Sequence, residues 1–260
     1  MPASPDSPAR PPWYRRLAAH PAVPIATELV AKGLAFLVFG NMLWISLQGA
    51  WANGQGAWEA GGLHRWAETA DRLAMALFLL LVLVAYAVRP LPARRAVGIL
   101  PRVAAYVGGF LVTPLPLLPL LMIRFPWLQQ APWLVLGWRV PVLSFVGLGL
   151  TLVGHALSAA SIATLGRSFS IVPEARTLVT RGPYRWVRHP VYVAEAVAAL
   201  GVVLGNASAL AVTLLGLHVG IQLYRIRHEE RVLTAQFPEY REYARKVGML
   251  FPRVRRHRAT

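Results

Sequence analysis

Six long apolar stretches constrain the fold of this chain more than any other feature. A helix needs about 20 mostly apolar residues to cross the hydrocarbon layer of a membrane. The chain is also poor in charge, with 15% Asp, Glu, Lys and Arg and a mean hydropathy of +0.47, which excludes an ordinary soluble domain and a disordered chain. The predicted spans cover about residues 25–47, 73–88, 103–123, 140–165, 191–205 and 207–226. We therefore predict an all-α, polytopic integral membrane protein with about six transmembrane helices.

Two of the predicted spans have features that shape the fold. The third contains Pro114, Pro116 and Pro119, and proline removes a backbone donor and kinks or breaks a helix. The fifth and sixth are separated by little more than Gly205-Asn206, which predicts a tight turn between antiparallel helices. The chain should thus end in a helical hairpin followed by a cytoplasmic tail.

The basic residues predict how the helices are oriented. The net charge is +16, and 22 of the Lys and Arg residues fall on one side of the six predicted spans, whereas four fall on the other. Cytoplasmic loops carry such an excess, so both termini are predicted to be cytoplasmic. The basic character is thereby assigned to a membrane surface, and no nucleic-acid partner is expected. The preference for Arg over Lys and the many alanines suggest a bacterial inner membrane.

Three regions are expected along the chain. Residues 1–24 are predicted to be a disordered, basic cytoplasmic leader, residues 25–139 the N-terminal transmembrane helices, and residues 140–260 the core that carries the chemistry. In the first helix, Glu28 and Lys32 are four residues apart and are interpreted as a structural ion pair. His155 and His218 lie in apolar stretches and are expected to form hydrogen bonds between helices.

The sequence offers no sign of a metal site. The chain has no cysteine, which excludes disulfides, thiolate ligands and cysteine nucleophiles. The intramembrane histidines do not have the spacing of a known metal-binding motif. No bound metal is therefore expected.

A polar, basic and aromatic segment at residues 176–192 leads directly into the fifth predicted helix. Gly182-Pro183 predicts a turn, and Pro190 suits the first turn of a helix, where a missing N–H costs nothing. His189 would lie beside the unsatisfied backbone donors of that helix, which could hold a carboxylate. An aromatic and basic belt at a membrane surface would have a similar composition.

A second polar cluster, residues 224–233, lies at the cytoplasmic end of the sixth predicted helix. Arg225 and Glu229 share one helix face, and the hairpin should bring His189 and Tyr192 next to them. Such a site could hold a polar cofactor on the water side and admit a lipid tail from the membrane side. Solvated ion pairs at a helix end are the alternative interpretation.

Together, the two segments resemble the isoprenylcysteine carboxyl methyltransferase family, to which phospholipid methyltransferases are related. The resemblance covers roughly residues 140–253. It is carried by Gly182-Pro-Tyr-Arg-Trp-Val-Arg-His-Pro-Val-Tyr192, by Glu229-Glu230-x-x-Leu233-x-x-x-Phe237-x-x-Tyr240-x-x-Tyr243 and by Phe251-Pro252. It implies a helical membrane methyltransferase that uses S-adenosylmethionine without a Rossmann domain, and no glycine-rich dinucleotide loop is present in the chain.

The resemblance also implies roles for individual residues in the motifs 176–192 and 225–252. Glu229 is expected to contact the amino-acid part of the cofactor, and Arg225 to act as the catalytic residue that orients the acceptor, because an arginine fork suits a carboxylate. Glu230 is expected to support the neighbouring arginines. The other cofactor-binding residues implied are the strip Arg176, Thr177, Leu178 and Val179, whose backbone would line the cofactor, and the motif residues Tyr184, His189, Pro190, Val191 and Tyr192.

Three departures from the family pattern are visible. The glycine usual two positions after the motif tyrosine is Ala194 here, and it is followed by an unexpected Glu195. The usual Phe-Gly is Phe237-Pro238, which is expected to change a turn and not the cofactor site. Residues 169–174 do not align cleanly, so cofactor contacts there are left open.

The predicted function is transfer of a methyl group from S-adenosylmethionine to a lipophilic acceptor. The acceptor implied is a carboxylate on an isoprenoid-like or prenylated substrate, with a lipid thiol or amine left open. The main alternative is an NADPH-dependent membrane reductase of the sterol-reductase type, whose C-terminal motif is similar; Gly182-Pro-Tyr184 and Glu229-Glu230 favour methyl transfer. A transporter or scaffold ranks last, because no inverted repeat is visible.

Overall fold

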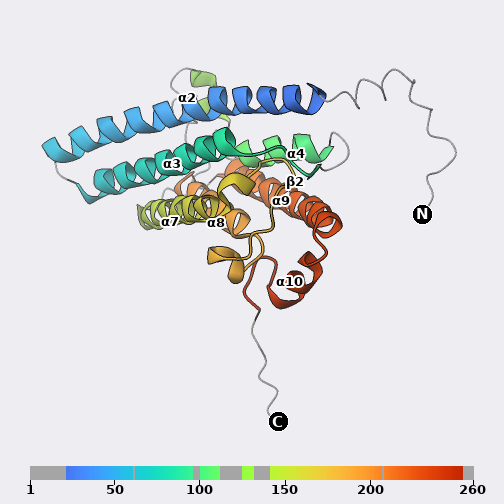
Figure 1. The fold of residues 1–260 in the computed structure, drawn as a ribbon. Coiled ribbons are helices and arrows are strands. Elements are labelled where there is room, and N and C mark those ends of the chain that lie inside the picture. The colour runs from blue at the N-terminus through green and yellow to red at the C-terminus, as the bar shows by residue number, and fades with distance from the viewer. Residues whose placement is uncertain are drawn as a thin grey trace, which may run out of the picture.

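The computed structural model describes residues 22–60, 62–95, 100–111, 125–131, 141–206 and 208–253. Helices dominate these residues (Figure 1). The α-helices are α2 (Ala22–Ala60), α3 (Leu63–Val88), α4 (Leu100–Phe110), α7 (Pro141–Leu165), α8 (Pro190–Asn206), α9 (Ala209–Gln236) and α10 (Tyr240–Lys246). The short elements are the strands β1 (Arg94–Arg95) and β2 (Glu174–Ala175) and the 3-10 helices η2 (Pro126–Gln130), η3 (Gly166–Ser168) and η4 (Gly182–Arg185).

The predicted helical membrane fold is confirmed. Within the described residues, α2, α3, α7 and α9 are long and apolar enough to cross a membrane, and α8 is a shorter apolar helix. Large apolar side chains such as Leu29, Val30 and Leu37 point outward, as expected for a surface that faces lipid. The count of six spans is not confirmed. The third predicted span is described only as far as α4, and residues 112–124 lie outside the described part, as do residues 1–21 of the predicted leader.

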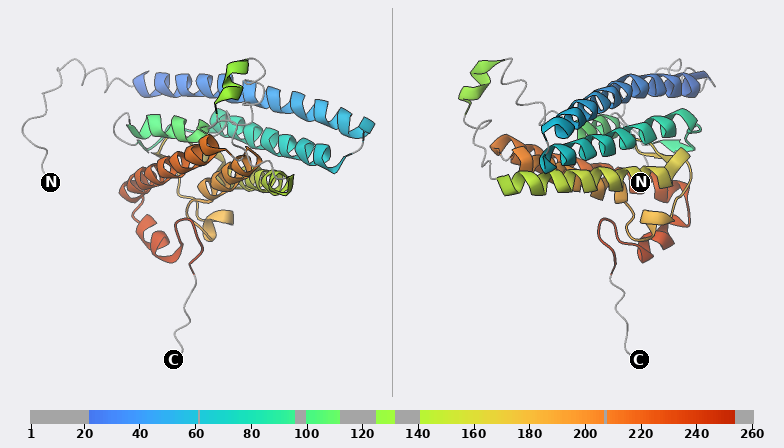
Figure 2. Two further views of the ribbon diagram at one scale, coloured as in Figure 1. Left: turned by 180° about the vertical axis from the view of Figure 1, so that it is seen from behind. Right: turned by 90° about the vertical axis from the view of Figure 1, so that its left-hand side faces the viewer.

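The helices form two neighbouring groups (Figures 1 and 2). Helices α2 and α3 run antiparallel side by side, and α3 packs on α7, which in turn packs on α8. Helix α4 lies against α9, and the short helix α10 follows the end of α9. The start of α2, the end of α3 and the end of α9 therefore lie at the same end of the molecule as β2 (Figure 1).

Small residues allow α7 and α8 to approach closely. A Cβ atom on Gly147 would lie 2.6 Å from the Gly201 carbonyl oxygen, and one on Gly154 would lie 2.5 Å from the Ala198 nitrogen. Such contacts are typical of helix packing in membranes. They also explain the departure at Ala194, because this buried alanine backs onto Gly154, whose missing side chain provides the space.

The predicted hairpin between α8 and α9 is confirmed. Ser208 caps α9, since its side chain accepts a hydrogen bond of 3.2 Å from the Ala211 nitrogen, the usual role of serine at this position. Val203 and Ala211 pack against each other next to the turn. The far end of α9 therefore returns beside Pro190, where α8 begins.

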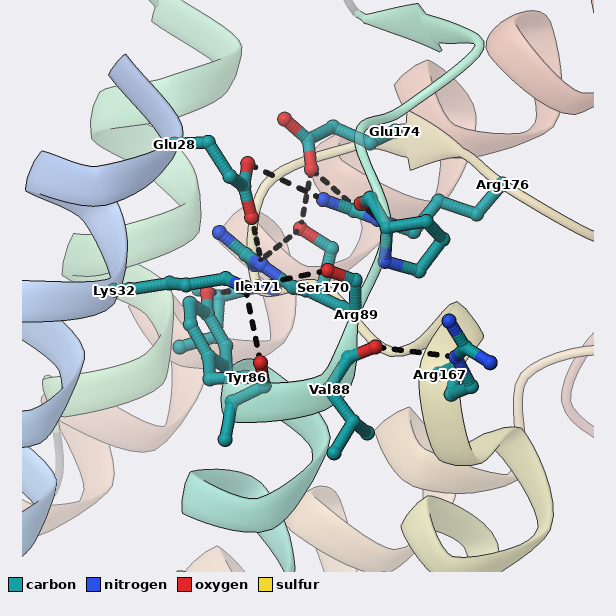
Figure 3. A network of polar contacts seen from close by, with 12 residues as sticks. Glu28, Lys32, Tyr86, Val88, Arg89, Arg167, Ser170, Ile171, Glu174 and Arg176 are labelled. Carbon is teal, nitrogen blue, oxygen red and sulfur yellow. Dashed lines mark hydrogen bonds and ion pairs between the residues drawn. The ribbon is translucent and has the colours of Figure 1, made fainter. Parts of the chain in front are cut away.

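A buried network of charges joins the N-terminal helices to the segment before the site (Figure 3). We call Glu28, Arg89, Glu174 and Arg176 the Glu28 network. Arg89 Nε donates to Glu28 Oε1 at 2.5 Å, Arg176 Nη2 lies 3.5 Å from Glu28 Oε2, and Arg176 Nη1 donates to Glu174 Oε2 at 2.6 Å. The pairing of β1 with β2 and a 2.9 Å hydrogen bond from Arg176 Nε to the Pro90 oxygen fasten the same segment to the end of α3.

This network corrects the interpretation of Glu28 as the partner of Lys32 in a local pair. Glu28 meets two arginines that come from distant parts of the chain. Lys32 Nζ donates to the carbonyl oxygens of Ala87 and Arg89 at 3.0 and 3.3 Å. Glu28 and Lys32 thus both fasten α2 to the end of α3.

The expectation for His155 is confirmed, and that for His218 stays a prediction. His155 Nδ1 lies 3.0 Å from Asp71 Oδ1 and so links α7 to α3. His218 is buried on α9 with its Nε2 3.5 Å from Gln222 Nε2 on the same helix.

Candidate cofactor and acceptor site

The turn that precedes α8 forms as its sequence predicts. Gly182 has φ +57°, a left-handed conformation that glycine adopts without strain. Pro183 follows in the first turn of η4, and Pro190 is the first residue of α8. The segment between them therefore places His189 directly before α8.

The C-terminal tail holds this segment in place. The backbone nitrogens of Arg188 and His189 donate to the carbonyl oxygens of Gly248 and Met249 at 2.8 and 3.2 Å. Tyr243 donates its hydroxyl proton to the Tyr184 carbonyl oxygen at 2.5 Å. Burial raises the pKa of Tyr243 to about 12 and that of Tyr184 well above its usual value, so both phenols keep their protons at neutral pH.

Glu230 organises the polar side chains at the start of α8. Its Oε1 accepts hydrogen bonds from Arg188 Nε at 2.8 Å and from the Tyr240 hydroxyl at 3.3 Å, and lies 3.1 Å from His189 Nε2. The expectation that Glu230 supports a neighbouring arginine is confirmed. The same contact directs one ring nitrogen of His189 toward Glu230, so the predicted contact of His189 with a cofactor would use the rest of the ring or the backbone.

The central prediction for the site, that the two motifs meet, is confirmed. The Tyr192 hydroxyl donates to Glu229 Oε2 at 2.8 Å, although the two residues are 37 positions apart. The guanidinium carbon of Arg225 lies 4.9 Å from the centre of the Tyr192 ring, within the range of a cation–π contact. Tyr192 thus touches both charged residues that the sequence placed beside it.

Arg225 is buried, with 5% of its surface exposed. Its Nη1 donates to Gln222 Oε1 at 2.6 Å, and its Nη2 donates to the Ile171 carbonyl oxygen at 3.1 Å. Among the described residues, its Nε has no hydrogen-bond partner. An unpaired buried donor costs about 1–3 kcal/mol, so this atom marks a position where a bound acceptor oxygen or nitrogen would be stabilised.

Two residues that lie next to Arg225, Glu195 and Gln222, were not predicted as site residues. Glu195 Oε2 accepts a hydrogen bond from Gln222 Nε2 and lies 3.9 Å from Arg225 Nη1. Gln222 could have been found, because it lies three residues before Arg225 on the same face of α9. We call Tyr192, Glu195, Gln222, Arg225 and Glu229 the Arg225 cluster.

In the predicted strip of residues 176–179, the polar side chains contact residues outside the Arg225 cluster. The Arg176 guanidinium belongs to the Glu28 network, and the Thr177 hydroxyl contacts the Ser168 hydroxyl. Leu178 and Val179 are half-buried. Contact of the backbone of this strip with a cofactor stays a prediction, as do the cofactor contacts of Pro190 and Val191, the latter of which packs in the apolar core.

A small apolar groove lies between the N-terminal helices and the site. Ile171 belongs to the groove through its lining and to the Arg225 cluster through its carbonyl oxygen. The groove is lined by Ala31, Leu34, Ala35, Val38, Phe39, Tyr86, Tyr106 and Ile171. An apolar space therefore reaches the backbone that Arg225 contacts.

The fold and site define an integral-membrane helical protein whose last two apolar helices form a polar site. Residues 147–235 match the model of the isoprenylcysteine carboxyl methyltransferase (ICMT) family. This segment, about a third of the chain, is therefore similar to that family.

Similar proteins of two kinds are found. The cobalt-zinc-cadmium resistance protein CzcN of Cupriavidus metallidurans is 34% identical over 141 residues, 46% of this chain and 64% of that protein. The protein-S-isoprenylcysteine O-methyltransferase A of Arabidopsis thaliana is 35% identical over 142 residues, 51% of this chain and 66% of that protein. The chain thus matches less than two thirds of the length of each. A solved structure of the eukaryotic intramembrane Ras methyltransferase ICMT overlaps 92% of this chain and 80% of that chain, with 20% identity and a TM-score of 0.41.

Proposed function

We propose that this protein transfers a methyl group from S-adenosylmethionine to a lipophilic acceptor inside the membrane. The observation that carries the proposal is the contact between Tyr192 and Glu229 beside the buried Arg225. It unites the two motifs of the family at one place between α8 and α9. The match of residues 147–235 to the family model supports the same reaction class.

The donor set at this place suits S-adenosylmethionine. Glu229 presents a carboxylate that would pair with the ammonium group of the cofactor. The start of α8 offers backbone donors that would bind its carboxylate. When bound, the cofactor supplies a methyl group on a sulfonium, which is a good leaving group, so no activated protein nucleophile is needed.

The work left to the protein is positioning and exclusion of water. His189, Tyr192 and Glu229 would hold the cofactor, and Arg225 would orient the acceptor through its Nε, which has no hydrogen-bond partner in the described part of the chain. The apolar groove that ends at Ile171 would receive the lipid chain. The family implies a carboxylate acceptor. Arg225 alone does not distinguish a carboxylate from a protic head group.

The orientation and location of the protein follow the same proposal. The basic residues around the site and in the tail support a cytoplasmic position of the site, where S-adenosylmethionine is available. We propose the bacterial inner membrane, with both termini in the cytoplasm.

Binding of the two rival cofactors separates methyl transfer from reduction. A wide, open depression lined in part by Arg227, Arg231 and Arg241 lies beside Glu230 and is a described feature that would suit the phosphates of NADPH. Titration of the purified protein with S-adenosylmethionine and with NADPH should give binding of the first. Binding of NADPH alone would favour the reductase.

The decisive assay supplies the purified protein with methyl-labelled S-adenosylmethionine and a bacterial lipid extract. We expect label in a lipid-soluble product that mass spectrometry can identify. The matched control is Arg225→Ala, which should abolish the labelling. Absence of any labelled product from a protein that binds the cofactor would contradict the proposal.

A further inference from the structure

Glu195 is an acidic residue in the second turn of the apolar helix α8. It lies three positions after Tyr192, on the face of α8 that meets α9. Its side chain is 25% exposed, and its Oε2 lies 3.9 Å from Arg225 Nη1. An ionisable side chain at such a position is costly and marks a functional site.

Gln222 holds Glu195 and Arg225 apart while binding both. Its Nε2 donates to Glu195 Oε2, and its Oε1 accepts from Arg225 Nη1 at 2.6 Å. Glu195 therefore faces Arg225 without closing a direct hydrogen bond to it. Arg225 Nε has no hydrogen-bond partner among the described residues, so the guanidinium group that Glu195 faces keeps one donor for a ligand.

The charges of the Arg225 cluster disfavour an anionic acceptor. Arg225 and Glu195 carry opposite charges when Glu195 is ionised, and Glu229 would pair with the ammonium group of the cofactor. A carboxylate head group next to Glu195 would add a second anion to this partly buried place, and like charges repel strongly there. A cationic or protic head group would instead complement Glu195.

We infer that the acceptor is a lipid-like amine and that Glu195 binds its head group and accepts its proton. The inference rests on the proposed methyl transfer and narrows its acceptor. An ammonium head group gives one proton to the Glu195 carboxylate and becomes a free amine. The amine lone pair then forms the new N–C bond as the S–C bond of the donor breaks and its electrons stay on sulfur. The products are a methylated ammonium, a neutral thioether and protonated Glu195.

The inference is tested by binding of farnesylamine and farnesoic acid, which share one chain and differ in the head group. Both are titrated into the purified protein without a methyl donor, so the readout does not depend on activity. We expect the wild-type protein to bind the amine at least tenfold more tightly than the acid. Glu195→Gln keeps the hydrogen bond from Gln222 and should remove this preference.

The matched control is Asp71→Asn, which removes an intramembrane carboxylate from the His155 pair on α3. It should leave the preference for the amine unchanged. Tighter binding of the acid than of the amine by the wild-type protein, or an unchanged preference in Glu195→Gln, would overturn the inference.

A kinetic measurement distinguishes failure of this inference from failure of the proposed function. With labelled S-adenosylmethionine, Glu195→Gln should lower the rate of amine methylation by about 100-fold, the effect of losing a general base. Methylation of the acid alone by the wild-type protein would overturn the inference and keep methyl transfer. A preference for the amine with no methylation of either compound would overturn methyl transfer and keep Glu195 as a binding residue.

Discussion

The protein contains two buried clusters of charge that are built differently. In the Glu28 network, opposite charges approach to 2.5 and 2.6 Å, and the side chains in these pairs are at most 8% exposed. In the Arg225 cluster, Glu195 stays 3.9 Å from Arg225, and Arg225 Nε has no hydrogen-bond partner among the described residues. Arg176 Nη2 of the Glu28 network also lacks a hydrogen bond there but lies 3.5 Å from Glu28 Oε2. The first cluster holds parts of the chain together, whereas the second is the one that we propose to bind a ligand.

The two clusters share the segment of residues 170–176. Glu174 and Arg176 belong to the Glu28 network, and the Ser170 hydroxyl donates to Glu174 Oε2 at 2.8 Å. The adjacent Ile171 accepts the hydrogen bond from Arg225 Nη2. The N-terminal helices thus contribute to the site by fixing the carbonyl oxygen against which Arg225 rests.

The largest effect is expected from Arg225→Ala. It removes the group that would orient the acceptor, so kcat/KM for methyl transfer should fall by about 1000-fold, at the upper end for loss of one oriented donor. Labelling from S-adenosylmethionine measures the rate. Arg227→Ala, two positions away on the exposed face of α9, is the control and should retain activity. Equal rates in the two variants would contradict the distinction between the clusters.

A substitution in the Glu28 network should lower the stability of the protein. Glu28→Gln leaves Arg89 and Arg176 with an uncompensated buried charge, which should cost about 3 kcal/mol in the free energy of unfolding. Thermal unfolding in detergent should show a lower midpoint, with the affinity of the folded protein for S-adenosylmethionine little changed. Glu242→Gln breaks an exposed pair with Lys246 and should leave the midpoint in place. If Glu28→Gln is as stable as this control, the Glu28 network does not stabilise the fold.

Tyr192→Phe should have a moderate effect confined to the Arg225 cluster. The substitution removes the hydrogen bond to Glu229 but keeps the ring beneath Arg225. Loss of one charge-assisted hydrogen bond corresponds to about a tenfold change, expected here in the dissociation constant of S-adenosylmethionine. An unchanged dissociation constant would mean that Tyr192 does not orient Glu229 for the cofactor.

The smallest effect is expected where α4 covers the cluster. A Cβ atom on Gly108 would lie 2.7 Å from Ile221 Cγ2 and 3.2 Å from Arg225 Cδ, so Gly108→Ala must displace side chains slightly. We expect kcat to fall by about threefold, roughly 0.7 kcal/mol. Gly149→Ala meets open space and should behave as wild type. Equal kcat values for the two variants would show that α4 does not constrain Arg225.

Local sequence patterns were sufficient to predict the centre of the site. The turn near Gly205 predicts the hairpin, and the hairpin brings Tyr192 to Glu229 without knowledge of the rest of the fold. The partners of Glu28 could not be predicted, because Arg89 is 61 positions away and the local spacing to Lys32 suggested a different pair. The contact of Arg225 with Ile171 also depends on a long-range packing arrangement that no periodicity encodes.

The central claim is that Glu229 belongs to a cofactor site formed by α8 and α9. Titration calorimetry of S-adenosylmethionine into the wild-type protein and into Glu229→Gln tests it most directly. We predict one binding site in the wild-type protein and an affinity at least tenfold weaker in the variant, because the carboxylate that would meet the ammonium group is lost. Equal affinities in the two proteins would contradict the account.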